Sequence, residues 1–174
     1  MNEYNKKILL ITTGGTIASV NTKDGLVPAG SEILKNEIEH LRAYYAIEVC
    51  DLMCLDSSNI QPEEWVKIAR CVFDRRAGVD GIVITHGTDT MAYTSSILSF
   101  MLRNIDIPVV LTGAQLPMQN PISDAFDNLR TAFLMAASGR AGVFVAFDRH
   151  VMLGCRAVKV RAERFDAFEC VNRA

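Results

Sequence analysis

Hydroxyl, carboxylate and glycine residues follow several short apolar runs of the chain, and together they have the groups needed for nucleophilic chemistry. The segments are Thr12–Ala18, Asp56–Asn59, Thr85–Thr90 and Thr112–Gln115. Taken alone, each is typical of turns and helix caps, where Ser, Thr, Asp and Gly are common. Three of the four present hydroxyls at the same place relative to an apolar run. We therefore expect one polar site built from several of these turns.

A threonine hydroxyl next to an acid and an amine is an arrangement suited to nucleophilic catalysis. The free hydroxyl is a weak nucleophile and needs a base to take its proton. A lysine acts as that base only when it is neutral, which burial favours because burial lowers the pKa of an amine. Asp89 would orient such an amine but also favours its charged form, so burial must outweigh the carboxylate. The spacing leaves open which lysine lies near Thr88.

Cofactor and metal chemistry find no support in the residue spacing. The first turn contains Gly14 and Gly15 but has neither the GxGxxG nor the GxxxxGK[ST] pattern, so no bound nucleotide is indicated. The cysteines are odd in number and scattered, with no CxxC pair and no histidine at ligand spacing. We interpret them as small buried hydrophobic residues, and we expect neither a metal nor an organic cofactor. They are Cys50, Cys54, Cys71, Cys155 and Cys170.

Length and composition indicate one soluble globular domain. The chain has 174 residues, of which 49% are hydrophobic and 22% charged, with a formal net charge of −2. This charge argues against a nucleic-acid partner, and the basic stretch 156–164 is interrupted by Glu163, as on a solvated surface. No apolar run approaches the ~20 residues of a membrane helix, and the first run ends at Thr12, too early for a secretory segment. We expect a cytoplasmic protein without a membrane partner.

Apolar runs alternate with helical patterns along the chain, which predicts an α/β fold. Strands are expected at 7–12, 48–55, 80–85, 108–111 and 142–147, and helices at 31–44, 62–76, 90–102 and 124–137. Residues 19–30 have loop or hairpin composition, and 151–160 predicts a β-hairpin extension. Continuous apolar strands imply a flavodoxin- or Rossmann-like parallel sheet with helices on both faces. Such sheets bind ligands beyond the carboxyl ends of their strands, which is where the polar turns fall.

The turns resemble the signatures of the L-asparaginase family. Thr-Gly-Gly-Thr-Ile-Ala at 13–18 is similar to its first signature, and Thr-His-Gly-Thr-Asp-Thr-Met at 85–91 is similar to its second. Further fitting segments are 112–115, 123–129, 156–160 and 165–168, while 56–58 and 91–94 resemble the cytosolic bacterial type. The resemblance covers essentially the whole chain. It implies that residues 1–174 form the amino-terminal catalytic domain, with the family's carboxyl-terminal domain absent.

The resemblance implies a threonine-dependent amidohydrolase. Thr16 would attack the side-chain amide of L-asparagine and form an acyl-enzyme with loss of ammonia, leaving L-aspartate after hydrolysis. Thr88, Asp89 and Lys159 would form a proton relay. L-Glutamine would be a poorer substrate. No metal or organic cofactor is implied, and members of the family are homo-oligomers.

Substrate-binding residues follow from the same resemblance. Ser57 and Asp89 would hold the α-carboxylate and α-amino groups, and Ser58 would line the same pocket. Backbone N–H groups near Thr88 and Ala114 would stabilise the developing oxyanion, a contribution of several kcal/mol in acyl transfer. We assign His86 no catalytic role, because its position after a strand indicates a core or turn histidine.

Two departures from the family pattern affect the expected activity. Leu26 stands where family members carry a tyrosine in the loop that closes over the substrate, and leucine supplies no phenol hydroxyl. The chain ends at Ala174, about where a linker to the second domain would begin. That domain completes the active site of a neighbouring subunit in the family. We therefore expect weak or no activity from this chain alone, and an exposed apolar patch where the partner would pack.

Three alternatives stay open at this stage. One is an ammonia-releasing subunit of a tRNA-dependent amidotransferase, which shares the threonine motifs but usually carries an extra domain before them. Another is a non-catalytic or co-assembling truncated paralogue that binds acidic amino acids. A third is a fragment of a longer gene product.

Overall fold

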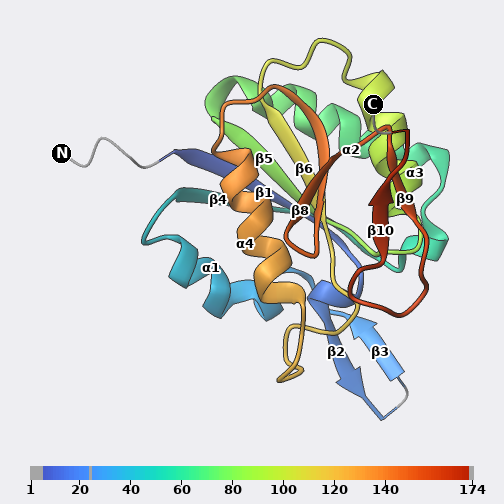
Figure 1. Cartoon of the computed structure of the whole chain (residues 1–174). Helices are drawn as coiled ribbons and strands as arrows, with labels where there is room; N and C mark the ends of the chain where they lie inside the picture. The colour runs from blue at the N-terminus through green and yellow to red at the C-terminus, as the bar shows by residue number, and fades with distance from the viewer. Residues whose placement is uncertain (1–5, 24, 173–174) are drawn as a thin grey trace.

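A six-stranded sheet forms the centre of the molecule (Figure 1). The computed structural model describes residues 6–23 and 25–172. The sheet order is β4-β1-β5-β6-β7-β8, and all neighbours are parallel except β7 and β8. Taken in chain order, the parallel strands lie as 2-1-3-4-5, which is the flavodoxin-like order. The strands are β1 (Lys7–Gly14), β4 (Ala46–Leu55), β5 (Gly81–Thr85), β6 (Pro108–Thr112), β7 (Gly142–Phe147) and β8 (His150–Leu153).

Four α-helices cover the two faces of the sheet, which confirms the predicted α/β architecture (Figure 1). They are α1 (Lys35–Leu41), α2 (Pro62–Arg75), α3 (Met91–Met101) and α4 (Ala125–Ala136). Strand β1 is buried on both sides: Leu9 and Ile11 belong to the apolar core under α2 and α3, while Ile8 and Leu10 belong to the core under α1 and α4. Alternate side chains of a strand point to opposite faces, so a continuous apolar run is required here.

The segment after β1 differs in detail from its expected structure. Strands β2 (Ser19–Thr22) and β3 (Gly25–Pro28) pair antiparallel and project from the domain (Figure 1). The helix expected at 31–44 begins as a 3₁₀ turn, Gly30–Leu34, and α1 is only seven residues long. Ser31 does not cap a helix, because its hydroxyl and backbone N–H donate to the Asp51 carboxylate at 2.8 and 3.2 Å.

The extension expected at 151–160 is present, but its strands pair with other partners. Strand β8 turns back antiparallel on β7, through Asp148 and Arg149, whose φ angles are 47° and 59°. Two positive φ angles are typical of the two-residue turns that match the twist of a hairpin. Strand β9 (Ala157–Lys159) instead pairs antiparallel with β10 (Phe168–Cys170), and Lys159 lies opposite Phe168.

The cysteines are less buried than we expected. Cys54 and Cys155 are exposed, while Cys50, Cys71 and Cys170 are half-buried, and all five are free. Cys50 and Cys54 lie on β4, an edge strand of the sheet that is covered less completely than the strands inside it. Within residues 6–23 and 25–172, no three His, Cys, Asp or Glu side chains are grouped to hold a metal ion. None of the helices in this part of the chain has the length and apolarity needed to span a bilayer.

Candidate active site

The first and third polar turns of the predicted site, which follow β1 and β5, come together at the middle of the sheet. Strands β1 and β5 are neighbours, and Thr12 of β1 lies beside Thr85 of β5 in the register. Thr16 follows β1 in a 3₁₀ turn, and Thr88 follows β5. The strand order reverses between these two strands, since β4 lies on one side and β6 on the other. A ligand site is expected beyond the strand ends at such a reversal.

Glycines allow three turns to approach one another closely. Gly15 has a φ of 81°, and a Cβ atom there would lie 2.4 Å from the backbone nitrogen of Gly87. A Cβ atom on Gly87 would lie 2.5 Å from the hydroxyl oxygen of Ser57. Neither distance is compatible with a side chain. The turns after β1, β4 and β5 therefore enclose one small space only because these two positions are glycine.

That space is a cavity of about 80 Å³. It is lined by Gly15, Thr16, Ser19, Asp56, Ser57, Gly87, Thr88 and Asp89. Thr16 is half-buried at its wall, whereas Ser57 and Thr88 are buried. Hydroxyls and carboxylates thus dominate the lining, and the cavity has the size of a few polar atoms rather than of a nucleotide.

Lys159 reaches this site from the far end of the chain. Its Nζ donates to Thr88 Oγ1 at 2.9 Å and to Asp89 Oδ1 at 2.6 Å. The Lys159 side chain is 14% exposed, whereas that of Asp89 is 67% exposed. Strand β9 ends at Lys159, and its pairing with β10 fixes the direction of the backbone there. The structure therefore brings together the threonine, the aspartate and the lysine that the sequence motifs single out.

Gln115 is a member of this network that the sequence analysis did not identify. Thr88 Oγ1 donates to Gln115 Oε1 at 3.2 Å, and Gln115 Nε2 donates to the carbonyl oxygens of Ala162 and Arg164 at 2.9 Å each. The side chain thus joins the turn after β5 to the loop that follows Lys159. Gln115 stands in one of the polar turns noted in the sequence, but its partners are too distant along the chain for spacing to reveal them.

Two polar side chains at the start of α4 hold the turn after β6: half-buried Asp124, just before the helix, and buried Asn128 within it. The carboxylate of Asp124 accepts from the backbone N–H of Gln115 at 3.0 Å, and Asn128 Nδ2 donates to the Gly113 carbonyl at 3.0 Å. Asn128 also donates to Asp124 at 2.9 Å and is fully buried. Ala114, between these anchors, is 1% exposed and is absent from the cavity wall. Its expected oxyanion role therefore stays a prediction that depends on its backbone alone.

The turn after β4 presents different side chains to the cavity from those we expected. Ser57 lines the cavity, but Ser58 does not. The hydroxyl and backbone N–H of Ser58 both donate to Asp56 Oδ1, at 2.7 and 2.8 Å, so Ser58 is turned toward that carboxylate. These two bonds hold the pKa of Asp56 below its usual value. Asp56 is therefore an ionised cavity residue that the sequence analysis did not single out.

His86 supports the turn after β5 from inside the protein. It is fully buried, with Nδ1 2.8 Å from the Gly87 carbonyl oxygen and Nε2 3.0 Å from Thr94 Oγ1, and Trp65 Nε1 donates to that same hydroxyl at 2.9 Å. Burial lowers the pKa of His86 to about 4, so the ring is neutral at pH 7. These contacts fit the expected core or turn histidine.

Leu26 stands where the family carries a tyrosine. Its backbone is in β3, and its side chain lies outside the described residues.

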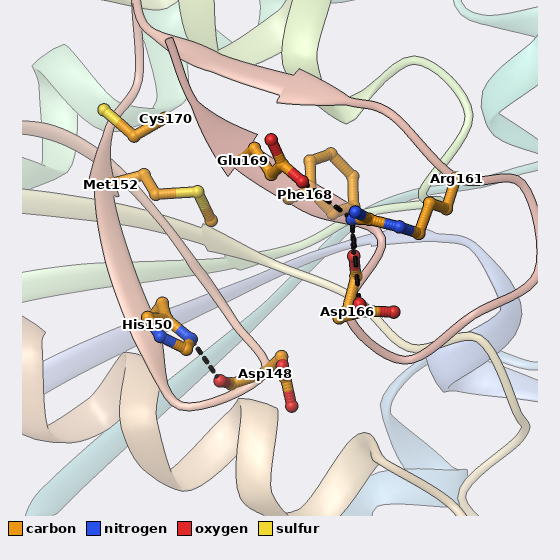
Figure 2. A pocket seen from close by; sticks show the side chains of 8 residues that line it. All are labelled: Asp148, His150, Met152, Arg161, Asp166, Phe168, Glu169 and Cys170. Atoms are coloured by element: carbon orange, nitrogen blue, oxygen red, sulfur yellow. Dashed lines mark hydrogen bonds and ion pairs between the residues drawn. The ribbon is translucent and has the colours of Figure 1, made fainter. Parts of the chain in front are cut away.

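A second pocket lies beside β8 and β10 (Figure 2). Its volume is about 400 Å³, and its charged groups largely satisfy one another. Arg161 donates to Glu169 at 2.8 Å and lies 3.7 Å from the Asp166 carboxylate, and His150 Nδ1 lies 2.6 Å from the Asp148 carbonyl oxygen. None of the threonines, serines, lysine or aspartates of the predicted site lines this pocket. The cavity at the strand reversal is therefore the stronger candidate.

Fold and site together define a class: flavodoxin-like α/β domains with a threonine–lysine–aspartate site where the strand order reverses. The comparison with protein families is specific within that class. The chain belongs to the family "Asparaginase, N-terminal", whose model matches residues 7–174.

Named relatives agree with this assignment. The chain is 51% identical over 168 residues to an L-asparaginase of Thermococcus kodakarensis, covering 95% of this chain and 51% of the relative. The solved structure of the thermostable T. kodakarensis L-asparaginase superposes with a TM-score of 0.87 at 48% identity, over 97% of this chain and 52% of that one.

Two further relatives have different names. A probable cytoplasmic L-asparaginase from Campylobacter jejuni has a TM-score of 0.86 at 30% identity, over 97% of this chain and 54% of that one. A glutamyl-tRNA(Gln) amidotransferase subunit of Thermoplasma acidophilum is 36% identical over 184 residues, covering 96% of this chain and 43% of the relative. The chain thus spans about half the length of the relatives it matches.

Proposed function

We propose that this domain forms the catalytic half of an amidohydrolase that converts L-asparagine to L-aspartate and ammonia. One observation carries the proposal. The Lys159 amine is hydrogen-bonded to Thr88 and Asp89 at 2.9 and 2.6 Å, and both residues line the same cavity as Thr16. Membership of the asparaginase family and the names of the relatives support the same reading.

In the proposed reaction Thr16 is the nucleophile. Its Oγ1 bonds to the amide carbon while its proton passes to the Thr88–Lys159 pair, and the carbon–nitrogen bond then breaks as that proton leaves with ammonia. Water hydrolyses the resulting ester and restores the Thr16 hydroxyl. In the structure the Thr88 hydroxyl donates to Gln115 and accepts from Lys159. The relay therefore requires the Thr88 hydroxyl to turn from Gln115 toward Lys159, with the amine in its neutral form.

Charge at the cavity favours an amino-acid substrate. Asp56 and Asp89 both line the cavity, and Asp56 is held ionised by Ser58. We assign these carboxylates to the α-ammonium group, and the buried Ser57 hydroxyl to the α-carboxylate. Ser58 then acts through Asp56 rather than by direct contact. The backbone N–H groups of the turns at Thr88 and Ala114 remain the proposed oxyanion donors.

Assembly and location belong to the same proposal. We infer a homo-oligomer from the resemblance to the family, whose members are homo-oligomers. A cytoplasmic location is supported by the name of the C. jejuni relative. L-Glutamine is the proposed poorer substrate.

A second candidate function is ammonia release from glutamine for a tRNA-dependent amidotransferase. The relative from T. acidophilum supports it, since that protein is named as part of an amidotransferase and matches 96% of this chain. Substrate preference separates the two functions. Faster ammonia release from L-glutamine than from L-asparagine would favour the amidotransferase reading.

The test measures ammonia release from both amides together with calorimetric binding of L-aspartate. Thr16→Ala should lower the rate on L-asparagine by on the order of 10³-fold or more, while aspartate binding and the circular dichroism spectrum stay unchanged. Thr16→Ser is the matched control, because it keeps a hydroxyl at the same position and should retain part of the rate. Because weak activity is expected from this chain alone, the decisive comparison is with Thr16→Ala: aspartate binding with an ammonia rate that Thr16→Ala leaves unchanged would instead support a non-catalytic binding module.

A further inference from the structure

Two cysteines from different elements lie close to each other outside the cavity. Cys50 of β4 and Cys71 of α2 have their Sγ atoms 3.9 Å apart. Both are half-buried, and both pack against the apolar core under α2 and α3. The proposed hydrolase chemistry uses neither thiol. Their contact therefore needs an explanation of its own.

The geometry allows a covalent bond between these sulfurs. A disulfide has its sulfurs about 2.0 Å apart, so the pair must close by roughly 2 Å. In the part of the chain that the structure describes, β4 is at the edge of the sheet and pairs with β1 alone, which leaves it freer to shift than an inner strand. Changes in the cysteine χ1 angles supply part of the movement. Backbone adjustment of β4 or α2 supplies the rest.

We propose that Cys50 and Cys71 form a disulfide when the protein is exposed to a peroxide, and that this bond cross-links α2 to β4. Hydrogen peroxide first converts one thiol to a sulfenic acid and is itself reduced to water. The other thiol then displaces the sulfenic oxygen as a second water, which forms the sulfur–sulfur bond. Each sulfur is oxidised by one electron overall, and both thiol protons leave in the two waters.

The other three cysteines lack such a partner in the described part of the chain. Cys54 and Cys155 are exposed, and the Cys170 thiol lies 3.9 Å from the Val171 carbonyl oxygen. Cys54 is the main competitor, since it lies four residues from Cys50 on the same strand. Burial, followed by the neighbouring Cys50, raises the pKa of Cys71 to about 11, so Cys71 stays protonated at neutral pH. The cross-link should therefore form slowly, with Cys50 as the thiol that peroxide attacks first.

The disulfide would close a loop that contains part of the cavity lining. The loop from Cys50 to Cys71 contains the turn Asp56–Asn59, which contributes Asp56 and Ser57 to the cavity. Cross-linking a loop of this length restricts the unfolded chain, and we expect the thermal midpoint to rise by roughly 5–10 °C. Neither sulfur lines the cavity. Ligand binding at the cavity should therefore change by less than about twofold.

The experiment oxidises the folded chain with hydrogen peroxide and maps the product without reduction. Trypsin releases Cys50 and Cys54 in the peptide 43–67 and Cys71 in the peptide 71–75. We expect these peptides to be joined, with a mass two hydrogens below their sum, and we expect dithiothreitol to reverse both the link and the rise in thermal midpoint. Cys54→Ser should still cross-link. Cys50→Ser and Cys71→Ala should each lose the cross-link and the thermal shift together.

Outcomes that overturn the proposal are equally distinct. One is a link that survives in Cys50→Ser but disappears in Cys54→Ser, which would assign the bond to Cys54. Another is unlinked Cys50 in the sulfinic or sulfonic state, because a thiol with a partner within reach should be trapped earlier. If a single variant fails to fold, the other variants and the unchanged chain still give the peptide map. The peptide map and the thermal midpoint do not depend on ammonia release. They therefore test the disulfide even if the proposed function is wrong.

Discussion

The Lys159 amine contacts two different groups of the site, a hydroxyl and a carboxylate. Its Nζ donates to the Thr88 hydroxyl at 2.9 Å and to the Asp89 carboxylate at 2.6 Å. The side chain is 14% exposed. The same residue can therefore act as a proton acceptor or as a fixed positive charge. Substitution distinguishes these roles.

Arginine at position 159 is the decisive variant. It keeps a charge that can pair with Asp89, but it cannot be deprotonated at working pH and so cannot act as a base. If Lys159 is the base, Lys159→Arg and Lys159→Met should both lower kcat for L-asparagine by on the order of 10²–10⁴-fold. Steady-state kinetics of the two variants measure this. An arginine variant with nearly full kcat beside an inactive methionine variant would show that the charge alone is needed.

At the scale of elements, the site depends on how closely three turns approach. The 3₁₀ turn after β1 touches the turn after β5 at Gly15 and Gly87, and the latter touches Ser57 after β4. Thr90 Oγ1 adds a 2.8 Å bond to the Ser57 carbonyl, which ties the start of α3 to the same turn. The shape of the cavity therefore depends on close contacts at two glycines, Gly15 and Gly87. A methyl group at the contact should separate the turns.

Gly15→Ala should lower the free energy of unfolding by about 2–4 kcal/mol. The new Cβ would meet the Gly87 nitrogen at 2.4 Å, and the φ of 81° is unfavourable for alanine. Gly78→Ala is the matched control, because its Cβ would meet no atom within 4 Å, and we expect a change within about 0.5 kcal/mol. Urea unfolding of both variants measures the difference. Equal stabilities would mean that the turns tolerate separation.

Elements that depend on the residue pattern within one segment were predictable from the sequence. Elements that depend on contacts with residues far along the chain were not. The apolar runs that became β1, β5, β6 and β7 need burial on both faces, and the polar turns after them follow from the same pattern. The shortened helix α1 was not predictable, because the partner of Ser31 is Asp51 on β4. The Gln115 network depends on carbonyls at Ala162 and Arg164. Family resemblance identified Lys159, whose distance along the chain from Thr88 left spacing uninformative.

On the scale of the whole molecule, one buried histidine joins the site to the core. His86 contacts the Gly87 carbonyl oxygen of the cavity wall, and through Thr94 of α3 it is linked to Trp65 of α2. Two helices and the end of β5 thus meet at a ring that has no exposed surface. A charge on this ring would be far more costly than on an exposed histidine. The stability of the whole domain should therefore depend on pH through His86.

The sign of this dependence follows from the two pKa values. His86 has a pKa of about 4 in the folded protein, against 6.5 for an unperturbed histidine, so between these values the unfolded chain binds a proton that the folded chain does not. The free energy of unfolding should therefore rise with pH across that window. The contribution is complete above about pH 6.5 and lost as the pH falls toward 4, with an upper limit of about 3 kcal/mol. Asp51, Asp56 and Asp80 have lowered pKa values, so their losses occur at still lower pH.

Replacing the histidine should remove the pH dependence in this window. His86→Gln keeps a polar side chain but has no titrating ring, so its free energy of unfolding should change less than that of the unchanged protein between pH 6.5 and 4. Urea unfolding at half-unit pH steps measures the two slopes. The same substitution at exposed His150 controls for the loss of one histidine. A slope that His86→Gln leaves unchanged would mean that His86 binds protons equally in the folded and unfolded chain, and that other groups cause the acid sensitivity in this window.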